Sequence, residues 1–166
     1  ISSVDKNNQP HSRFVNFKYF FEDNLVFFSN YESHKAQNFI DNDKVCVNFW
    51  WPNIEVQVRI EGIISKCEEK FSDEHFQGRK PAKNVAALVS EQSKKIESYD
   101  LLKQKYETMK ERIENGEDVN SRPKNWGGYQ IKVHFFEFWE ANDDRLNYRE
   151  CYEKNDKSWS KYFLQS

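Results

Sequence analysis

Cations and hydroxyls gather between residues 13 and 35, a combination suited to binding a phosphate. Arg13 and Lys18 bracket one predicted strand, and Ser29 directly follows a second, apolar strand. Ser33 is a good N-cap for the helix predicted next. Free backbone N–H groups at a helix start, together with hydroxyls and cations, favour an anion. The simpler alternative is that these are solvated charges on an ordinary hairpin.

The spacing of the two leading cations sets a geometric condition. Arg13 and Lys18 are an odd number of residues apart, so a regular strand would direct them to opposite faces. They can share a ligand only if the strand contains a bulge or if one side chain reaches round the strand end.

Composition limits the classes of function. The chain has 166 residues and a net charge of −2, which predicts one domain and gives no basic field for nucleic acid. Aromatic residues make up 16% of the chain, so many of them must pack in a core or bind something. No apolar run approaches membrane-spanning length, and we expect no membrane segment.

The three cysteines are Cys46, Cys67 and Cys151, and they are widely spaced. An odd number without a CxxC pair or a nearby histidine cluster indicates neither a disulfide framework nor a zinc or other metal site. We therefore expect a reducing, cytoplasmic compartment. Because the chain begins at Ile1 without Met, any preceding targeting segment cannot be judged.

Hydrophobic patterning predicts strands at both ends of the chain and helices in the middle. Strands are expected at 1–4, 11–18, 25–28, 45–51, 56–64, 126–139, 145–151 and 159–164. The run at 45–51 is predicted to be buried on both faces, and Gly62 to mark a bulge. Helices are expected from Ser33 to about Asn42, within 72–96 with Ser72 as a cap and an interruption at 79–81, and after Ser98.

Helices that do not alternate with strands predict an α+β, mainly β domain built on an antiparallel barrel or sandwich. Within it, Gln57 and Arg59 share one strand face, which either meets solvent or lines a polar ligand cavity. The common phosphate-loop, dinucleotide, hydrolase and zinc-protease motifs are absent. His11, His34, His75 and His134 are scattered, and each alone is better explained as a surface or packed histidine than as a catalytic base.

A series of short motifs resembles the pyridoxamine 5'-phosphate oxidase family over nearly the whole chain. In order they are RFVNFK at 13–18, FSN at 28–30, SHKA at 33–36, QVRIEG at 57–62, SEQS at 90–93, WGGY at 126–129, EFW at 137–139 and RLNYR at 145–149. Each motif is weak alone, but their order and spacing together are specific. The WGG and EFW segments resemble the C-terminal part peculiar to this group of flavin proteins.

The resemblance implies an FMN-binding split β-barrel, antiparallel and Greek-key-like, with a few peripheral helices. It implies one domain over 1–166, with 126–166 as the family-type C-terminal segment and the family's N-terminal segment absent. It also implies a homodimer with FMN at the intersubunit interface. The residues that would hold FMN by position are Arg13, Lys18, Ser29, His34, Lys35, Gln57, Gln92, Ser93, Trp139 and Arg149.

The implied reaction is oxidation of pyridoxine or pyridoxamine 5'-phosphate to pyridoxal 5'-phosphate, with hydride passing to flavin N5 and dioxygen giving hydrogen peroxide. By position, the substrate phosphate would be held by Lys18, His75, Arg79 and Lys83. Arg145 and Asn147 would cover the pyridine ring as the catalytic residues.

Several positions depart from the family pattern. His34 replaces an arginine, so we expect weaker FMN retention as the pH rises above neutrality. His75 and Lys83 replace Tyr and Ser, and Asn147 replaces a histidine that could exchange a proton. The family's closing Arg-Leu-Ala-Pro is FLQS at 163–166.

Two alternatives follow from these departures. One is a paralogue of the same fold that oxidises another ring, as in the related phenazine-pathway oxidases, because the changes lie around the substrate. The other is a non-catalytic protein that binds FMN or pyridoxal phosphate.

Overall fold

The computed structural model describes residues 1–156 and 158–166, and the chain divides into two compact units. The first unit consists of residues 1–27, 38–65 and 130–166, and the second of residues 28–37 and 66–129.

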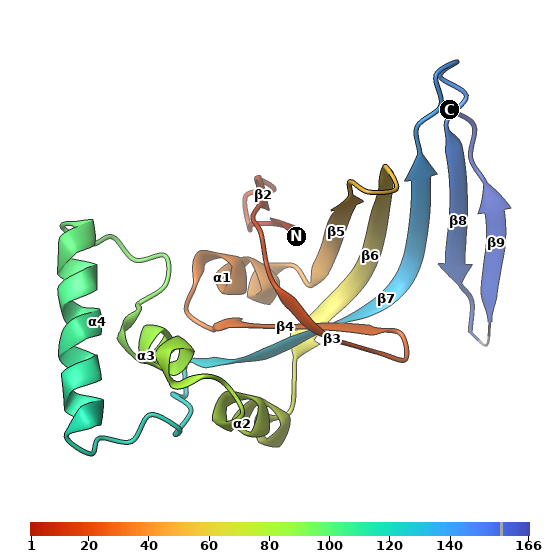
Figure 1. The fold of residues 1–166 in the computed structure, drawn as a ribbon. Coiled ribbons are helices and arrows are strands. Elements are labelled where there is room, and N and C mark those ends of the chain that lie inside the picture. Colours follow the sequence, from red (N-terminus) through yellow and green to blue (C-terminus); the bar gives the residue numbers. More distant parts are fainter. Residues whose placement is uncertain (157) are drawn as a thin grey trace. The chain divides into compact units, whose positions relative to one another are not determined.

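The described residues form nine strands and four helices, and every strand pair with a defined register is antiparallel (Figure 1). The strands are β1 (Ser2–Val4), β2 (Pro10–Ser12), β3 (Phe17–Phe21), β4 (Asn24–Asn30), β5 (Lys44–Trp51), β6 (Val56–Lys66), β7 (Trp126–Glu140), β8 (Tyr148–Lys154) and β9 (Trp159–Phe163). The helices are α1 (His34–Asp41), α2 (Glu69–Gln77), α3 (Pro81–Val89) and α4 (Tyr99–Glu114). This content confirms the predicted mainly β, antiparallel class.

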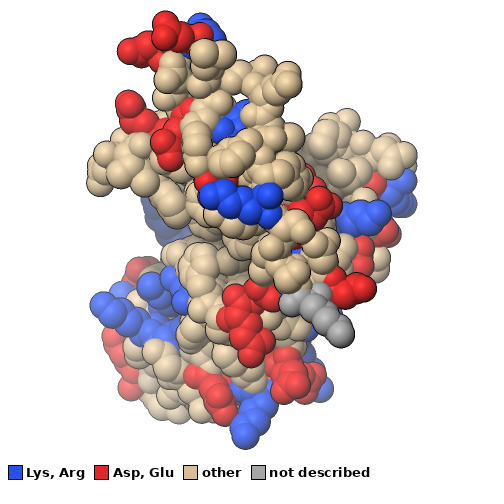
Figure 2. All heavy atoms as spheres, turned by 90° about the vertical axis from the view of Figure 1, so that its right-hand side faces the viewer, with Lys and Arg blue, Asp and Glu red and all other residues tan. Residues whose placement is uncertain are grey.

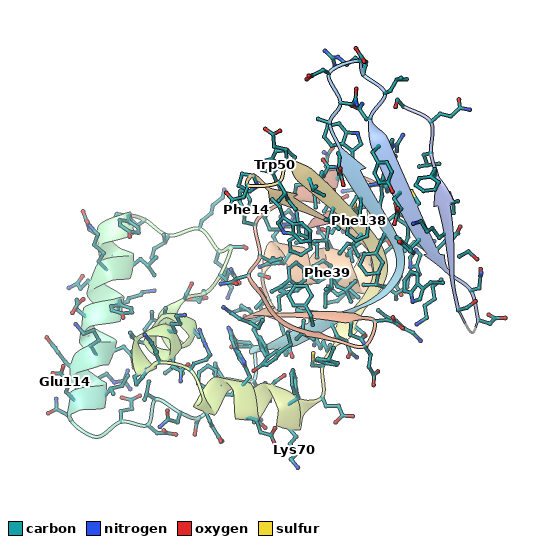
Figure 3. The ribbon with its side chains drawn as sticks, turned by 45° about the vertical axis from the view of Figure 1, so that its right-hand side comes forward. Phe14, Phe39, Trp50, Lys70, Glu114 and Phe138 are labelled. Atoms are coloured by element: carbon teal, nitrogen blue, oxygen red, sulfur yellow. The ribbon has the colours of Figure 1, made fainter. Side chains whose placement is uncertain are left out.

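The sheet has the strand order β2-β1-β5-β6-β7-β4-β3, and β8 and β9 extend it from β7. Along β6, buried and half-buried residues alternate from Val56 to Gly62, as the sequence pattern predicted. In the first unit, Phe39 of α1 packs against Phe27 with ring centroids 6.4 Å apart, and it lies among the side chains beside the sheet (Figure 3). Apolar side chains from α1 and the strands therefore form the core of this unit.

Two predictions about the central strands were wrong. The pairing of β5 with β6 runs without a break from Lys44↔Ile63 to Trp51↔Val56, so Gly62 marks no bulge. A Cβ at Gly62 would lie 2.5 Å from Cγ2 of Ile131, so glycine serves a close approach to β7. The strand at 45–51 is not buried on both faces, because Trp50 and Trp51 are 55% and 45% exposed.

The predicted strand at 11–18 is divided into β2 and β3, with residues 13–16 outside both strands. Pairing between β3 and β4 shifts register between Phe17 and Tyr19, which leaves Lys18 as the extra residue. A bulge was one of the two conditions under which Arg13 and Lys18 could share a ligand, and the shared ligand itself stays a prediction.

In the second unit, Ser72 lies inside α2 and does not cap it, which corrects the sequence prediction. Its buried hydroxyl accepts a hydrogen bond of 3.0 Å from the backbone N–H of Gly128. Pro81 opens α3, which confirms the interruption between α2 and α3. Helix α4 follows Ser98 as predicted, and Ser98 is its N-cap, with the hydroxyl accepting from the N–H of Leu101 at 3.1 Å.

Helix α4 packs on α3, and the Tyr106 hydroxyl donates to the carbonyl of Ala82 at 3.2 Å. The apolar residues along one face of α4 are half-buried, and no residue of this helix is fully buried; these apolar residues are Leu102, Tyr106, Met109 and Ile113. No helix among the described residues is long and apolar enough to cross a bilayer. Acidic and basic side chains are interspersed over the face that Figure 2 presents.

Candidate cofactor and substrate site

Gln92 connects the end of β4 to the segment after α3 in the second unit. Its side-chain oxygen accepts from the Ser29 hydroxyl at 3.1 Å and from the backbone N–H of Asn30 at 3.3 Å. The next residue, Ser93, has a φ of 74°, in the left-handed region that non-glycine residues seldom adopt. The structure thus brings together Ser29 and Gln92, which the sequence placed at the cofactor.

The start of α1 carries a buried cation. Lys35 is only 8% exposed, and its Nζ donates to the Ser33 hydroxyl at 3.1 Å. Ser33 is fully buried and accepts from the N–H of Gln37 through its carbonyl, whereas His34 is exposed. An ammonium, a hydroxyl and the N-terminal end of a helix form a donor set that fits a phosphate.

A pocket of about 180 Å³ lies beside Gln92. It is lined by Asn30, Arg79, Lys83, Ala86, Ala87, Ser90, Gln92 and Trp126. The Nη2 of Arg79 donates to the carbonyl of Lys83 at 2.9 Å, while its buried Nη1 has no hydrogen-bond partner among the described residues. Burial lowers the pKa of Arg79 from its ordinary value, but a guanidinium remains charged at neutral pH. A bound anion would satisfy this donor.

Aromatic rings support the guanidinium of Arg79. It lies 4.5 Å from the centroid of the Trp126 ring and 5.3 Å from that of Phe76. The Phe28 ring stacks on the Trp126 ring with centroids 5.3 Å apart, and the His75 ring stacks on Phe28 with centroids 3.6 Å apart. His75 thus lies on Phe28 and does not line the pocket of Arg79 and Lys83, and its phosphate contact stays a prediction.

Three more of the predicted residues belong to the first unit. Arg13 donates through Nη1 to the buried Ser3 hydroxyl at 2.7 Å, and burial lowers its pKa. Lys18 is exposed at the bulge of β3. Gln57 is half-buried on β6, opposite Trp50 of β5.

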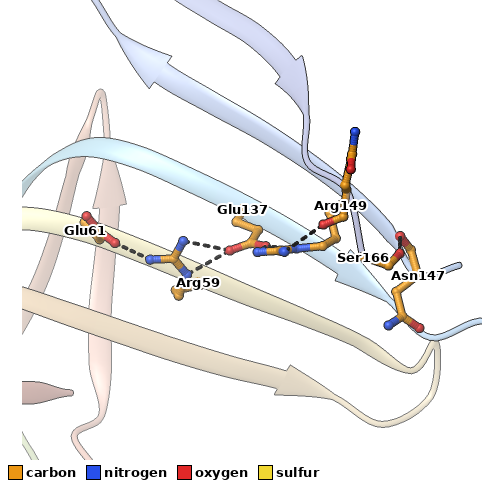
Figure 4. A network of polar contacts seen from close by, with 7 residues as sticks. Arg59, Glu61, Glu137, Asn147, Arg149 and Ser166 are labelled. Atoms are coloured by element: carbon orange, nitrogen blue, oxygen red, sulfur yellow. Dashed lines mark hydrogen bonds and ion pairs between the residues drawn. The ribbon is translucent and has the colours of Figure 1, made fainter. Parts of the chain in front are cut away.

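Arg149 and Trp139 face each other across β7 and β8 in the first unit. Arg149 donates through Nε to the carboxylate of Glu137 at 2.6 Å, and Arg59 donates to the same carboxylate at 2.8 Å (Figure 4). Arg59 also pairs with Glu61. Burial would raise the pKa of Glu137, but the bonds and charges of Arg149 and Arg59 outweigh it and hold the pKa below its usual value.

The loop between β7 and β8 carries the residues expected over the pyridine ring. The side-chain oxygen of Asn147 accepts from the backbone N–H of Asn142 at 3.1 Å. The backbone carbonyl of Asn147 accepts from the Ser166 hydroxyl at 3.1 Å. Arg145 is exposed, and its φ of 63° lies outside the range of a β-strand. Strand β8 begins at Tyr148, three residues later than predicted. Backbone strain of this kind is often found at functional positions.

The predicted site residues are divided between the units. The second unit holds Ser29, His34, Lys35, His75, Arg79, Lys83, Gln92 and Ser93, and the first holds Arg13, Lys18, Gln57, Trp139, Arg145, Asn147 and Arg149. Sequence reasoning did not assign a role to Asn30, Trp126 or Glu137. The last two lie in the WGG and EFW motifs, which were the available signal.

Two family models match the chain. The model described as pyridoxamine 5'-phosphate oxidase covers residues 1–112. The model described as the pyridoxine 5'-phosphate oxidase C-terminal dimerisation region covers residues 126–166. Together they match most of the sequence.

Curated relatives carry the same name. Pyridoxine/pyridoxamine 5'-phosphate oxidase 2 of Hydrogenovibrio crunogenus is 40% identical over 164 residues, covering 99% of this chain and 76% of that protein. The chloroplastic pyridoxine/pyridoxamine 5'-phosphate oxidase 1 of Arabidopsis thaliana is 35% identical over 156 residues, covering 94% of this chain and 29% of that protein.

Solved structures are similar in fold. PhzG from Burkholderia lata, in complex with tetrahydrophenazine-1-carboxylic acid, has a TM-score of 0.89 at 24% identity and covers 99% of this chain and 80% of its own. A pyridoxamine 5'-phosphate oxidase-related, FMN binding protein from Nostoc punctiforme has a TM-score of 0.79 at 18% identity, covering 99% and 85%. At these identities the likeness concerns the fold alone, and it confirms the predicted split-barrel fold.

Proposed function

Because the chain belongs to the pyridoxamine 5'-phosphate oxidase family of oxidoreductases, we propose that it oxidises pyridoxine or pyridoxamine 5'-phosphate to pyridoxal 5'-phosphate with FMN as cofactor. The observation that carries the proposal is the pocket beside Gln92, where Arg79 has a buried, unpartnered Nη1. Such a donor is costly to leave without a partner, and the phosphate ester of the substrate would satisfy it.

The chain offers matching groups for the cofactor. In the second unit, the bonded pair Ser29 and Gln92 and the buried Lys35 at the start of α1 would hold the flavin and its phosphate. In the first unit, Trp139 and Arg149 would contribute from neighbouring strands. Bound FMN would accept hydride from the substrate at N5 and pass the electrons to dioxygen, giving hydrogen peroxide.

The protein's part is orientation. Arg79 and Lys83 would fix the substrate phosphate, and Arg145 with Asn147 would cover the pyridine ring. Asn147 cannot exchange a proton as histidine can, so its contribution would be to position the ring. Its side-chain oxygen already orders the loop by accepting from Asn142, which supports this role.

A homodimer would complete each flavin site. Residues 126–166 match a dimerisation region, and Trp139, Asn147 and Arg149 all lie in this segment. We propose that the two chains share the FMN sites. The cytoplasmic location expected from cysteine usage stays a prediction.

The test is to load the protein with FMN, remove oxygen, add pyridoxine 5'-phosphate and follow the visible absorbance of the flavin. Bleaching, followed by peroxide formation when oxygen returns, is the expected result. Flavin that stays oxidised would contradict the proposal and favour a binding protein. Bleaching only by another ring substrate would favour a paralogue, for which the fold likeness to PhzG alone is no argument.

A further inference from the structure

A single carboxylate joins the two arginines of the first unit. Glu137 is 3% exposed, and each of its oxygens serves one arginine. Arg59 approaches Oε2 with Nε and Nη2, both at 2.8 Å, and Arg149 approaches Oε1 with Nε at 2.6 Å and Nη2 at 2.5 Å. Two N–H groups of each guanidinium therefore converge on one carboxylate oxygen, which restricts the direction of the guanidinium as well as its distance.

The guanidinium of Arg149 is held from a second side. Its Nη1 donates to the carbonyl of Gln165 at 3.1 Å, and Trp139 lies opposite it in register on β7. Only the remaining N–H groups can therefore reach a ligand, and only in directions that Glu137 and Gln165 leave open. An arginine fixed in this way loses little side-chain freedom when it binds.

The two arginines differ in how they are neutralised. Arg59 pairs with both Glu61 and Glu137, whereas Glu137 is the one carboxylate that pairs with Arg149 in the described part of the chain. Loss of Glu137 would therefore leave Arg149 without an ion-pair partner, held only by its bond to the carbonyl of Gln165, whereas Arg59 would keep Glu61.

We propose that Glu137 is a positioning residue that sets the orientation in which Arg149 meets the bound flavin, without touching the flavin itself. This inference rests on the proposed function, because it takes Arg149 as a flavin ligand. It assigns a role to a buried carboxylate that the reaction does not use directly.

The test measures the FMN affinity of the apoprotein by quenching of flavin fluorescence, which does not depend on turnover. We expect Glu137→Gln and Arg149→Ala each to weaken FMN binding about tenfold. In the double variant, Glu137→Gln should cause no further loss, because its effect passes through Arg149. A merely structural role would weaken binding again in the Arg149→Ala background, and that result would overturn the inference.

Glu61→Gln is the matched control, since Glu61 pairs with Arg59 and not with Arg149. We expect its FMN affinity to stay within about threefold of the parent protein. If Glu137→Gln fails to fold, Glu137→Asp keeps the charge but withdraws it by one methylene, and it should also bind FMN more weakly at an unchanged circular dichroism spectrum. Parent-like affinity of a folded Glu137 variant would overturn the inference.

The same titration separates this inference from the proposed function. If the parent protein binds FMN and Arg149→Ala does not weaken it, the positioning role fails while the flavin proposal stands. If the parent protein itself does not bind FMN, the proposed function fails and the inference fails with it.

Discussion

The arginines around Glu137 and the cations at the pocket of Arg79 differ in whether their charges are paired. In the first unit, Arg59 and Arg149 are neutralised by the buried carboxylate of Glu137. In the second unit, neither Arg79 nor Lys83 forms an ion pair with any described residue, and Nη1 of Arg79 is buried without a partner. The two arginines of the first unit therefore have carboxylate partners within the chain, whereas Nη1 of Arg79 would gain its partner from a bound anion.

The difference indicates that Arg79 is available to bind an anion, whereas the ion pairs of Glu137 hold Arg59 and Arg149 in place. A buried charge without a partner lowers stability, so it is retained where a ligand supplies the missing contact. A guanidinium whose Nε–H and Nη2–H groups both contact a buried carboxylate is restricted in its orientation. We therefore expect substitutions at Glu137 to lower stability and, through Arg149, FMN affinity, whereas substitution of Arg79 should lower ligand affinity with little change in stability.

The largest effect is expected at Glu137. Glu137→Gln leaves two arginines without their shared carboxylate and should lower the free energy of unfolding by about 3–5 kcal/mol. Glu61→Gln removes a carboxylate that is 42% exposed and should cost about 1 kcal/mol or less. Denaturant unfolding at pH 7 measures both values, and equal losses would contradict the assignment of Glu137 as the centre of the network.

The next effect is expected at Arg79. Arg79→Met keeps an apolar stem beside Trp126 but removes the guanidinium, and should weaken binding of pyridoxal 5'-phosphate about 10- to 100-fold. The free energy of unfolding should change by less than about 1 kcal/mol, because removing the buried Nη1 without a partner offsets the loss of the Nη2 bond to the Lys83 carbonyl. Absorbance titration of the bound aldehyde measures the affinity.

Lys80→Met is the control for this substitution, since Lys80 is the neighbouring cation, is exposed and does not line the pocket. It should bind the ligand as the parent protein does. If both variants lose affinity equally, bulk charge and not the pocket would account for binding.

The smallest effect is a pH dependence. Because the pKa of Glu137 is below its ordinary value of 4.5 in the folded protein, its contribution is present above that value and is lost as the pH falls through the folded-state pKa. The difference in melting temperature between the parent protein and Glu137→Gln should therefore shrink as the pH falls below 4.5.

The corresponding difference for Arg79→Met should stay constant over this range, since arginine does not titrate there. A constant difference for Glu137→Gln as well would show that its effect does not come from the ionised carboxylate.

Local signals in the sequence predicted much of the fold. The alternation in β6, the helix after Ser98 and the interruption before Pro81 each follow from neighbouring residues, and each was confirmed. Ser72 was misplaced as a cap, since its hydroxyl serves a backbone N–H that is 56 residues away. Gly62 was misread because the residue that limits its size, Ile131, lies on another strand.

The candidate site was predicted unevenly for the same reason. The cationic positions came from motif order, but their partners did not. The pairing of Gln92 with Ser29 spans 63 residues, and that of Arg59 with Glu137 spans 78. Contacts that depend on such long separations leave no periodic trace in the sequence, and so Trp126 and Glu137 were assigned no role before the structure.

The most direct test of the account compares two substrates that differ only in the phosphate. FMN-loaded protein is kept free of oxygen and mixed with pyridoxine 5'-phosphate or with pyridoxine at the same concentration, and the flavin absorbance is followed. If Nη1 of Arg79, which has no partner among the described residues, binds the phosphate of an oxidisable substrate, the ester bleaches the flavin at concentrations where the free alcohol leaves it oxidised. Equal bleaching by both, or by neither, would contradict the central claim.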